Sequence, residues 1–279
     1  MNVDVGSAVL FLGDDERWDR DFPQGSVSVR SRRSPEKDTP NEDAAMVIPL
    51  GRQGLVLAVA DGVGGTPAGR EASHLAVRAM GEALAHEDVD AEKLRPTILD
   101  AFEHANHRIL DLGRGAATTL VIAEIVSRRL RTYHVGDSEL LAVGQRGVIK
   151  SRVIPHSPTG FAVEAGLLDE HEAVSHDQRH ILFNVIGAAD MRVEISTAHK
   201  LATRDTVLLA SDGLLDNLFV AEIVEIIRKG PLPAAADSLM AKASARMRNG
   251  ATKQPSKPDD LTIALYRPRA PKRKPRSPD

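Results

Sequence analysis

The sequence predicts an α+β fold, a two-sheet antiparallel β-sandwich flanked by helix pairs in the layer order α-β-β-α. Strand-like runs rich in Val, Ile and Leu recur at residues 26–32, 44–49, 54–60, 118–126, 130–136, 139–144, 192–197, 205–211 and 261–266. Two pairs of segments with helical spacing of apolar residues interrupt them, at 67–86 and 91–112, and at 219–229 and 233–248. Strands and helices do not alternate regularly, so a doubly wound parallel sheet is disfavoured.

A chain of 279 residues is long enough for one large domain with a full core. We expect that domain over residues 26–267, after an irregular lead-in over residues 1–25. Residues 151–187 mix His, Pro and Gly with one short helix near 163–172, which indicates a mobile insertion beside the main body. Residues 268–279 are rich in Pro, Lys and Arg, so we expect a disordered basic tail that either solubilises the chain or docks an acidic partner.

The composition excludes several classes of function. Aromatic residues make up only 3% and the net charge is -3, so neither stacking platforms nor a basic surface favour nucleic-acid binding. The apolar runs are too short to cross a membrane, and no basic region precedes the apolar patch near the N-terminus, so a cytoplasmic location is expected. The lack of cysteine excludes disulfides, thiolate zinc sites and hydrolysis through a cysteinyl-phosphate.

Aspartates at the ends of apolar strands are the candidate chemical groups. The runs LVLAVADGVGG, RTYHVGDS and TVLLASDGLLD lead directly into Asp61, Asp137 and Asp212. Carboxylates at the ends of buried strands cost several kcal/mol in desolvation, so a positive charge must lie among them. Asp-Gly is most often a hairpin turn, but helical periodicity follows both Asp-Gly pairs, which favours strand-to-helix turns. The backbone at Gly62 can then approach a ligand, and its carbonyl oxygen suits a divalent cation.

Two further acidic motifs lie beside predicted strands, NED at 41–43 and PDD at 258–260. Either motif alone reads as solvated loop charges. Together with the three strand-end aspartates they form an all-oxygen ligand set, which selects Mg²⁺ or Mn²⁺ over zinc.

The order of these motifs resembles that of the metal-dependent protein phosphatases, the PPM or type 2C serine/threonine family, in its bacterial form. The matching segments are NED, VADGVGG, GAATTL, HVGDS, LLASDGLLD and PDDLT, and they span residues 26–267. The resemblance implies the two-sheet sandwich and hydrolysis of phosphoserine or phosphothreonine in proteins by a water that two metal ions activate. It also implies a monomer that opposes a Ser/Thr kinase. The insertion at 151–187 corresponds in position to the flap of the family, so a flap-like role is expected for it.

The resemblance also assigns roles to residues. Asp61, Asp212 and Asp259 are the implied catalytic residues. The Gly62 carbonyl is expected on one of two Mn²⁺ or Mg²⁺ ions that Asp61 bridges, and Asp212 and Asp259 on the other. Glu42 and Asp43 are expected to hold metal-bound waters, and Asp137 is expected to bind a third ion.

Several positions depart from the family pattern. Many members carry an arginine where this chain has Asp38, so Lys37, or else Arg33 or Arg32, is predicted to bind the substrate phosphate. Val63 stands where many members have a histidine, so the general acid is unassigned, with His134 and His156 as candidates.

Two alternatives stay open, and the missing arginine motivates the first of them. One is a pseudophosphatase, a binding module with the same fold, and the other is a phosphatase of small molecules.

Three more residues in the matching motifs have no assigned role in catalysis. Thr118 and Thr119 are expected to pack or hydrogen-bond in the sheet, and Glu139 follows GDS where arginine is frequent.

Overall fold

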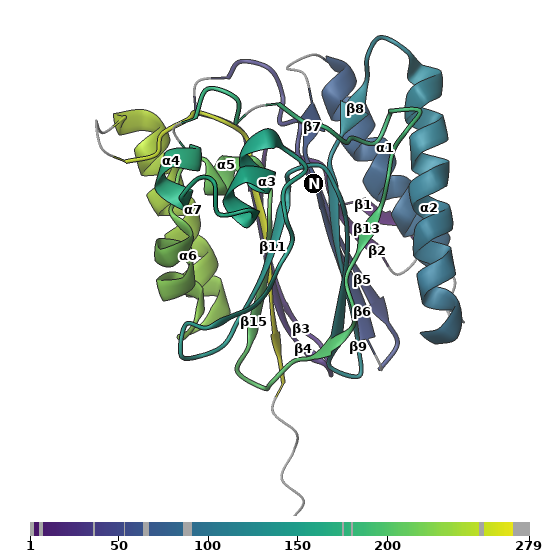
Figure 1. Ribbon diagram of the computed structural model, residues 1–279. Coiled ribbons are helices and arrows are strands. Elements are labelled where there is room, and N and C mark those ends of the chain that lie inside the picture. Colours follow the sequence, from purple (N-terminus) through teal and green to yellow (C-terminus); the bar gives the residue numbers. More distant parts are fainter. Residues whose placement is uncertain are drawn as a thin grey trace, which may run out of the picture.

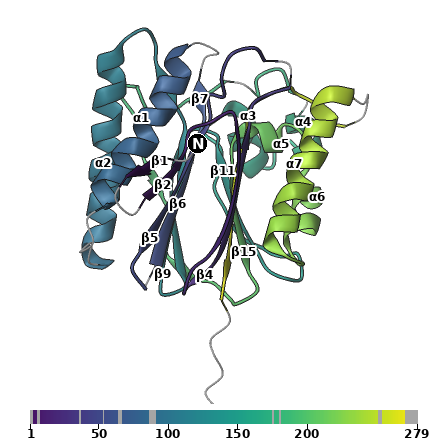
Figure 2. The ribbon, with the colours of Figure 1, turned by 180° about the vertical axis from the view of Figure 1, so that it is seen from behind.

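Two antiparallel sheets pack face to face, and a helix pair covers the outer face of each (Figure 1 and, from behind, Figure 2). This arrangement confirms the predicted α+β sandwich with its α-β-β-α layers. The computed structural model describes residues 3–5, 8–35, 37–52, 54–63, 67–85, 91–174, 176–179, 181–250 and 254–269. No helix within these ranges is both long and apolar enough to cross a membrane.

The strands divide between two large sheets and one small one. The first sheet has the order β1 (Val3–Val5), β2 (Ala8–Phe11), β5 (Ala44–Leu50), β6 (Gly54–Ala60), β9 (Leu120–Val126), β10 (Arg129–Val135) and β13 (Glu194–Ile195), with β14 (His199–Lys200) also paired to β10. The second has the order β12 (Ile149–Arg152), β11 (Glu139–Val143), β15 (Thr206–Ala210), β16 (Leu261–Pro268), β4 (Gly25–Arg32) and β3 (Asp15–Asp21). The small sheet pairs β7 (Gly62–Val63) with β8 (Ala117–Thr118).

The helices lie outside the sheets and at one end of the sandwich. The outer pairs are α1 (Pro67–Leu84) with α2 (Ala91–Leu112), and α6 (Val220–Ile227) with α7 (Leu232–Asn249). Short helices lie at the upper end of the sandwich in Figure 1, namely α3 (Pro158–Glu164), α4 (Glu170–Val174) and α5 (Asp212–Leu215).

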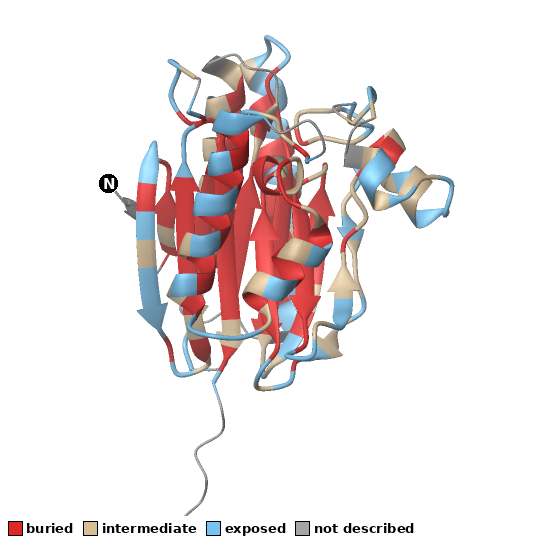
Figure 3. Cartoon of the chain, turned by 90° about the vertical axis from the view of Figure 1, so that its left-hand side faces the viewer, coloured by how far each residue is buried: buried red, intermediate tan, exposed pale blue. Residues whose placement is uncertain are grey.

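The core has three layers because the central strands are covered on both faces. In β6, Leu57 and Val59 face the second sheet, whereas Val56 and Ala58 face the helices α1 and α2. Every residue of β6 is therefore buried, as the continuous apolar run GLVLAVA predicts. Figure 3, which views the molecule from the side of α6 and α7, shows the same for strands of the second sheet, whose red bodies lie beneath helices with an exposed outer face. The third layer packs β15 and β16 against α6 and α7.

Three sequence-based boundaries need correction or stay open. The prediction of an irregular lead-in over 1–25 is wrong, because β2 pairs with β5 and β3 pairs with β4. The helix expected at 163–172 is wrong as one element, since α3 ends at Glu164 and α4 begins at Glu170. Most of the tail expected over 268–279 lies outside the described residues, and Pro268 still belongs to β16.

Candidate metal centre

The register of the first sheet brings two of the predicted acidic motifs together. Ala44 at the start of β5 lies opposite Ala60 at the end of β6. Asp43, directly before β5, and Asp61, directly after β6, therefore lie at the same end of two adjacent strands.

The second sheet supplies the other carboxylates from the facing edge. Ala210, the last residue of β15, lies opposite Glu139 of β11 and Ile263 of β16. Asp212, which begins α5, thus lies close to the GDS turn before β11 and to the PDD segment before β16. Strand ends far apart in the sequence converge at one rim of the sandwich, as the motifs predict.

The backbone of Asp61 is fixed by the two threonines of GAATTL. Its carbonyl accepts hydrogen bonds from Thr118 Oγ1 at 2.7 Å and from the Thr119 N–H at 2.8 Å. Its N–H donates to Thr119 Oγ1 at 3.0 Å, and that hydroxyl also bonds to Ser138 Oγ at 2.6 Å. This confirms that the threonines act by hydrogen bonding. They couple the position of Asp61 to the GDS turn that carries Asp137.

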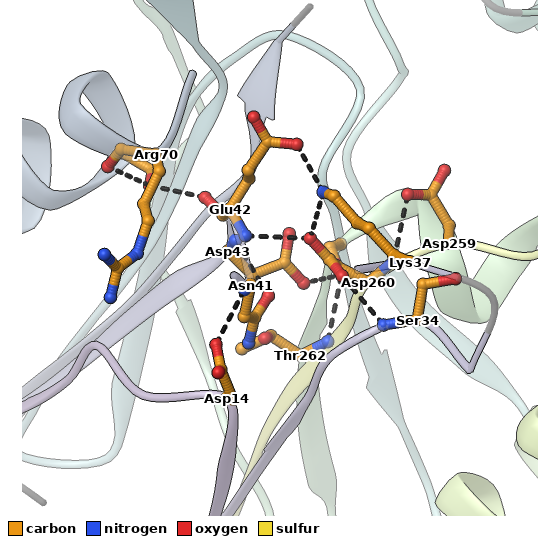
Figure 4. A network of polar contacts seen from close by, with 12 residues as sticks. Asp14, Ser34, Lys37, Asn41, Glu42, Asp43, Arg70, Asp259, Asp260 and Thr262 are labelled. Atoms are coloured by element: carbon orange, nitrogen blue, oxygen red, sulfur yellow. Dashed lines mark hydrogen bonds and ion pairs between the residues drawn. The ribbon is translucent and has the colours of Figure 1, made fainter. Parts of the chain in front are cut away.

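The NED motif is held by a carboxylate that the sequence analysis did not single out, Asp260 (Figure 4). Asp260 Oδ2 accepts the Glu42 N–H at 2.8 Å and Lys37 Nζ at 2.7 Å, and Oδ1 accepts the Ser34 N–H at 2.8 Å. Lys37 Nζ also bonds to Glu42 Oε2. Asp260 therefore orders the turn that presents Glu42 and Asp43. Its only sequence signal was its place beside Asp259 in PDD.

A second lysine lies among the carboxylates of the facing edge. Lys257 Nζ lies 2.7 Å from Asp212 Oδ2, 2.9 Å from Asp216 Oδ2 and 2.9 Å from Asp259 Oδ2. No sequence pattern predicts a role for this lysine. It supplies part of the positive charge that clustered carboxylates require.

The remaining charge is uncompensated, and the pKa values show it. Burial, followed by the charges of Asp43 and Asp212, raises the pKa of Asp61 well above its usual range. Burial and the charge of Asp212 do the same to the pKa of Asp137, and raise the pKa of Asp259 to about 6. Like charges held together without water favour the protonated forms, so this rim attracts cations.

Two buried oxygens in the cluster have no hydrogen-bond partner among the described residues. Asp43 Oδ2 accepts Ser211 Oγ at 2.7 Å and Asp212 Oδ2 accepts Lys257, but Oδ1 of each carboxylate is unpartnered. Buried acceptors without donors are costly unless a cation binds them. Hard oxygen donors of this kind fit Mg²⁺ or Mn²⁺. The residues present thus fit the divalent ions that the sequence analysis expects.

The glycines after Asp61 and Asp212 are required by close backbone contacts. A Cβ on Gly62 would lie 2.3 Å from the Gly69 carbonyl oxygen of α1, and one on Gly213 would lie 1.9 Å from the Asp260 carbonyl oxygen. No side chain fits at either position. Asp212-Gly213 joins β15 to α5, as predicted, whereas Gly62 begins the short strand β7, which pairs with β8 before α1 begins at Pro67. Neither Asp-Gly pair is the hairpin turn of two paired strands. Gly64 and Gly65 lie outside the described residues.

The candidate general acids, His134 and His156, are both buried and hydrogen-bonded within the protein. His134 Nε2 lies 2.9 Å from the Ile154 carbonyl oxygen. His156 Nδ1 accepts the Gly136 N–H at 3.1 Å, so its proton is on Nε2, which faces Glu194 Oε2 at 3.3 Å. These three side chains lie close enough to hold a metal, but the protonated Nε2 of His156 offers no lone pair. The general acid stays unassigned.

The segment 151–187 lies over the rim and is tied to the sheet below. Arg152 bonds to the buried carboxylate of Glu139 at 2.7 Å and also to Glu170 of α4. Glu139 therefore anchors the flap, and that the flap moves stays a prediction. Beneath it is a cavity of about 140 Å³ that extends from Asp137 and Asp212 to an apolar wall that includes Phe219.

The two candidates for phosphate binding lie differently. Lys37 reaches the cluster through Glu42 and Asp260, and its side chain is 22% exposed. Arg33 is exposed, and its backbone N–H donates to the Asp14 carbonyl. Asp38 is exposed as well. Of the predicted cations, the structure brings Lys37 into the site.

A sandwich with unpartnered carboxylate oxygens gathered at one rim fits the class of proteins that bind divalent cations, and similarity to known proteins shows the family. The sequence model of protein phosphatase 2C matches residues 31–248. Protein phosphatase PhpP of Streptococcus pneumoniae is 31% identical over 245 residues, which cover 82% of this chain and 92% of the relative.

Solved structures agree. The S. agalactiae serine/threonine phosphatase aligns with a TM-score of 0.74 and 28% identity, over 86% of this chain and 98% of that chain. The catalytic domain of the phosphatase PstP, solved with two manganese ions, aligns with a TM-score of 0.69 over 88% of this chain and 98% of that chain. At 22% identity, that second likeness shows the fold alone. The chain belongs to the protein phosphatase 2C family and is a phosphatase of the bacterial type.

Proposed function

We propose that this chain hydrolyses phosphoserine and phosphothreonine in proteins, in a reaction that requires Mn²⁺ or Mg²⁺ at the carboxylate rim. The observation that carries the proposal is the set of buried, unpartnered oxygens on Asp43 and Asp212 beside Asp61. Family membership supports the reaction class, and the names of the similar proteins support serine and threonine as the phosphorylated residues.

The residues that would hold the ions follow the predicted set. We propose Asp61, the Gly62 carbonyl, Asp212 and Asp259 for two ions, with Glu42 and Asp43 beyond them and Asp137 for a third. When bound, the ions supply a water activated for attack on phosphorus and neutralise the charge that develops on the phosphate. The protein's own part is to fix these oxygens. Thr118 and Thr119 hold the Asp61 backbone, and Ser211 holds Asp43.

The cavity under the flap supports a polypeptide substrate. It begins at Asp137 and Asp212 and continues to the apolar surface of Leu218 and Phe219. A phosphate held at the rim would leave the adjoining residues of a polypeptide beside this cavity. We further propose that the chain acts as a cytoplasmic monomer opposing a Ser/Thr kinase. Light scattering and cell fractionation test the monomer and the location.

The test of this function is phosphate release from a phosphothreonine peptide with Mn²⁺, with Mg²⁺ and with EDTA, beside a small aryl phosphate. We expect release with either metal, none with EDTA, and a higher kcat/KM for the peptide. A protein that binds metal but releases no phosphate from either compound would be a pseudophosphatase. Release from the small ester alone would favour a small-molecule phosphatase.

Lys37 is proposed to bind the substrate phosphate. Its ammonium lies beside Glu42 at the rim, where burial lowers its pKa but the bonds to Asp260 and Glu42 outweigh burial and raise it. Lys37→Ala is expected to raise the KM for the phosphothreonine peptide about tenfold, the loss of one charge-assisted hydrogen bond, with a smaller change in kcat. Steady-state kinetics measure both.

Arg33→Ala is the matched control for Lys37→Ala, since it removes an exposed cation of the same loop. We expect its KM to equal that of the wild type. An unchanged KM for Lys37→Ala, or a raised KM for Arg33→Ala, would contradict the assignment of the phosphate to Lys37.

A further inference from the structure

Lys257 is a cation that belongs to the carboxylate rim itself. We propose that its ammonium group permanently occupies the outer side of the cluster, between Asp212, Asp216 and Asp259, and thereby excludes a further divalent ion there. The inference rests on the proposed metal binding of this rim. The inference concerns the number of ions that the chain binds, because the ammonium charge of Lys257 compensates carboxylates that would otherwise bind one more ion.

The contacts of Lys257 use all the donors that an ammonium group has. An ammonium carries three N–H groups, and three carboxylate oxygens lie at 2.7, 2.9 and 2.9 Å from Nζ. Each oxygen comes from a different residue, and the lysine side chain is 26% exposed. A solvated surface lysine does not bridge three carboxylates in this way, since it keeps its water and its rotamer freedom.

The backbone of Lys257 is fixed as well, so its side chain enters the cluster from a set position. The fully buried Asn217 clamps it on both sides, with Oδ1 accepting the Lys257 N–H at 2.9 Å and Nδ2 donating to the Lys257 carbonyl at 2.8 Å. Asn217 Nδ2 also donates to the Gly213 carbonyl at 2.9 Å. The clamp therefore links Lys257 to α5, the helix that begins with Asp212.

Asp212 divides the rim into two sides. Its Oδ2 bonds to Lys257, whereas its Oδ1 is buried and unpartnered. Asp43 Oδ1 is unpartnered too, and the charges that act on Asp61 come from carboxylates. The inner side, with Asp43 and Asp61, thus needs divalent ions, while the outer side already has its cation.

The outer side is also where a third ion was predicted, at Asp137. The charges of Asp212 and Asp216 act on Asp137, and so does the opposite charge of Lys257. A third ion at Asp137 would need the side of Asp212 that Lys257 already occupies through Oδ2, and two cations at that short distance would repel each other without water between them. The lysine and a third ion are therefore alternatives.

The test counts the ions that Mn²⁺-loaded protein holds. Metal-stripped wild type, Lys257→Met, Lys257→Arg and Lys150→Met are dialysed against Mn²⁺, and bound ions per chain are measured by elemental analysis and by titration calorimetry. Methionine keeps the apolar stem and removes the charge, and arginine keeps the charge. Lys150 is the matched control, since it bonds to Asp205 at 2.6 Å, at the start of β15, away from the rim.

We expect Lys257→Met to hold one more Mn²⁺ per chain than the wild type, and Lys257→Arg and Lys150→Met to hold the wild-type number. We also expect Lys257→Met to unfold at a lower temperature than the wild type when metal-free, and to regain stability with Mn²⁺. Equal ion numbers and affinities in Lys257→Met and the wild type would overturn the inference while leaving the proposed function intact. A wild type that binds no Mn²⁺ would overturn both. If Lys257→Met folds only with Mn²⁺, dialysis from the loaded state still gives its ion count.

Discussion

Asp61→Asn is expected to lower the kcat/KM for a phosphothreonine peptide with Mn²⁺ at least about 10³-fold. Removing a central charge-stabilising group from other enzymes lowers their activity by a similar factor. Asp61 faces Asp43 and Asp212, and its charge acts together with theirs on any cation at the rim. Asparagine keeps the backbone bonds to Thr118 and Thr119 but removes the negative charge. Steady-state phosphate release with saturating Mn²⁺ measures the effect.

Two measurements separate lost chemistry from lost folding. The metal-free Asp61→Asn protein is expected to be at least as stable as the wild type, because the change removes one of several like charges that repel each other. Asp111→Asn, at the exposed end of α2, is the control and should keep wild-type activity. Wild-type activity in Asp61→Asn would show that the rim does not bind the ions on which the reaction depends.

The sequence predicted the central strands well because burial on both faces leaves a continuous apolar run. The run GLVLAVA matches β6 residue for residue, and TVLLA matches β15. It missed β3, whose residues DERWDRD form a charged edge strand with only Glu16 fully buried. Charged edge strands protect a sheet from pairing with other chains, and they hide the alternation that reveals a strand. The edge was therefore read as an irregular lead-in.

The candidate site, too, could be predicted from the sequence only in part. The aspartates at strand ends were predictable, because each lies next to its strand in the sequence. The contacts of the two lysines were not, since Lys257 bonds to a carboxylate 45 residues away and Lys37 to one 223 residues away. Side-chain pairs of this kind depend on how the two sheets meet. No local pattern distinguishes Lys257 from Lys253, the other lysine between α7 and β16 in the sequence.

Without metal, the protein is expected to lose stability as the pH rises from about 4 through 6 and beyond. Burial and the charge of Asp212 raise the pKa of Asp216 and of Asp259 from 3.8 to about 6. Between these values the folded state binds more protons than the unfolded state, so the free energy of unfolding falls with rising pH. For one group, that difference in pKa corresponds to about 3 kcal/mol.

The pKa of Glu222 is shifted in the opposite direction, so protonation of Glu222 limits the stability of the protein at acid pH. Burial raises its pKa, but hydrogen bonds from Arg246 and Lys242 outweigh burial and lower the pKa to about 2. Its contribution is present above its ordinary pKa of 4.5 and is lost as the pH falls toward 2. The metal-free protein should therefore be most stable in mild acid.

Saturating Mn²⁺ is expected to reverse the slope above pH 4, because cations that bind the ionised carboxylates stabilise the folded state more as the rim deprotonates. Urea unfolding of the metal-free and the Mn²⁺-loaded protein from pH 4 to 8 measures both slopes, and calorimetry in buffers of different ionisation enthalpy measures the protons that Mn²⁺ releases. Metal-free protein that gained stability steadily from pH 4 to 8, with no protons released on binding, would show that the rim carboxylates are already ionised and compensated in the folded chain. The charges of Lys37 and Lys257 would then suffice for the whole cluster, and the unpartnered oxygens of Asp43 and Asp212 would need no ion.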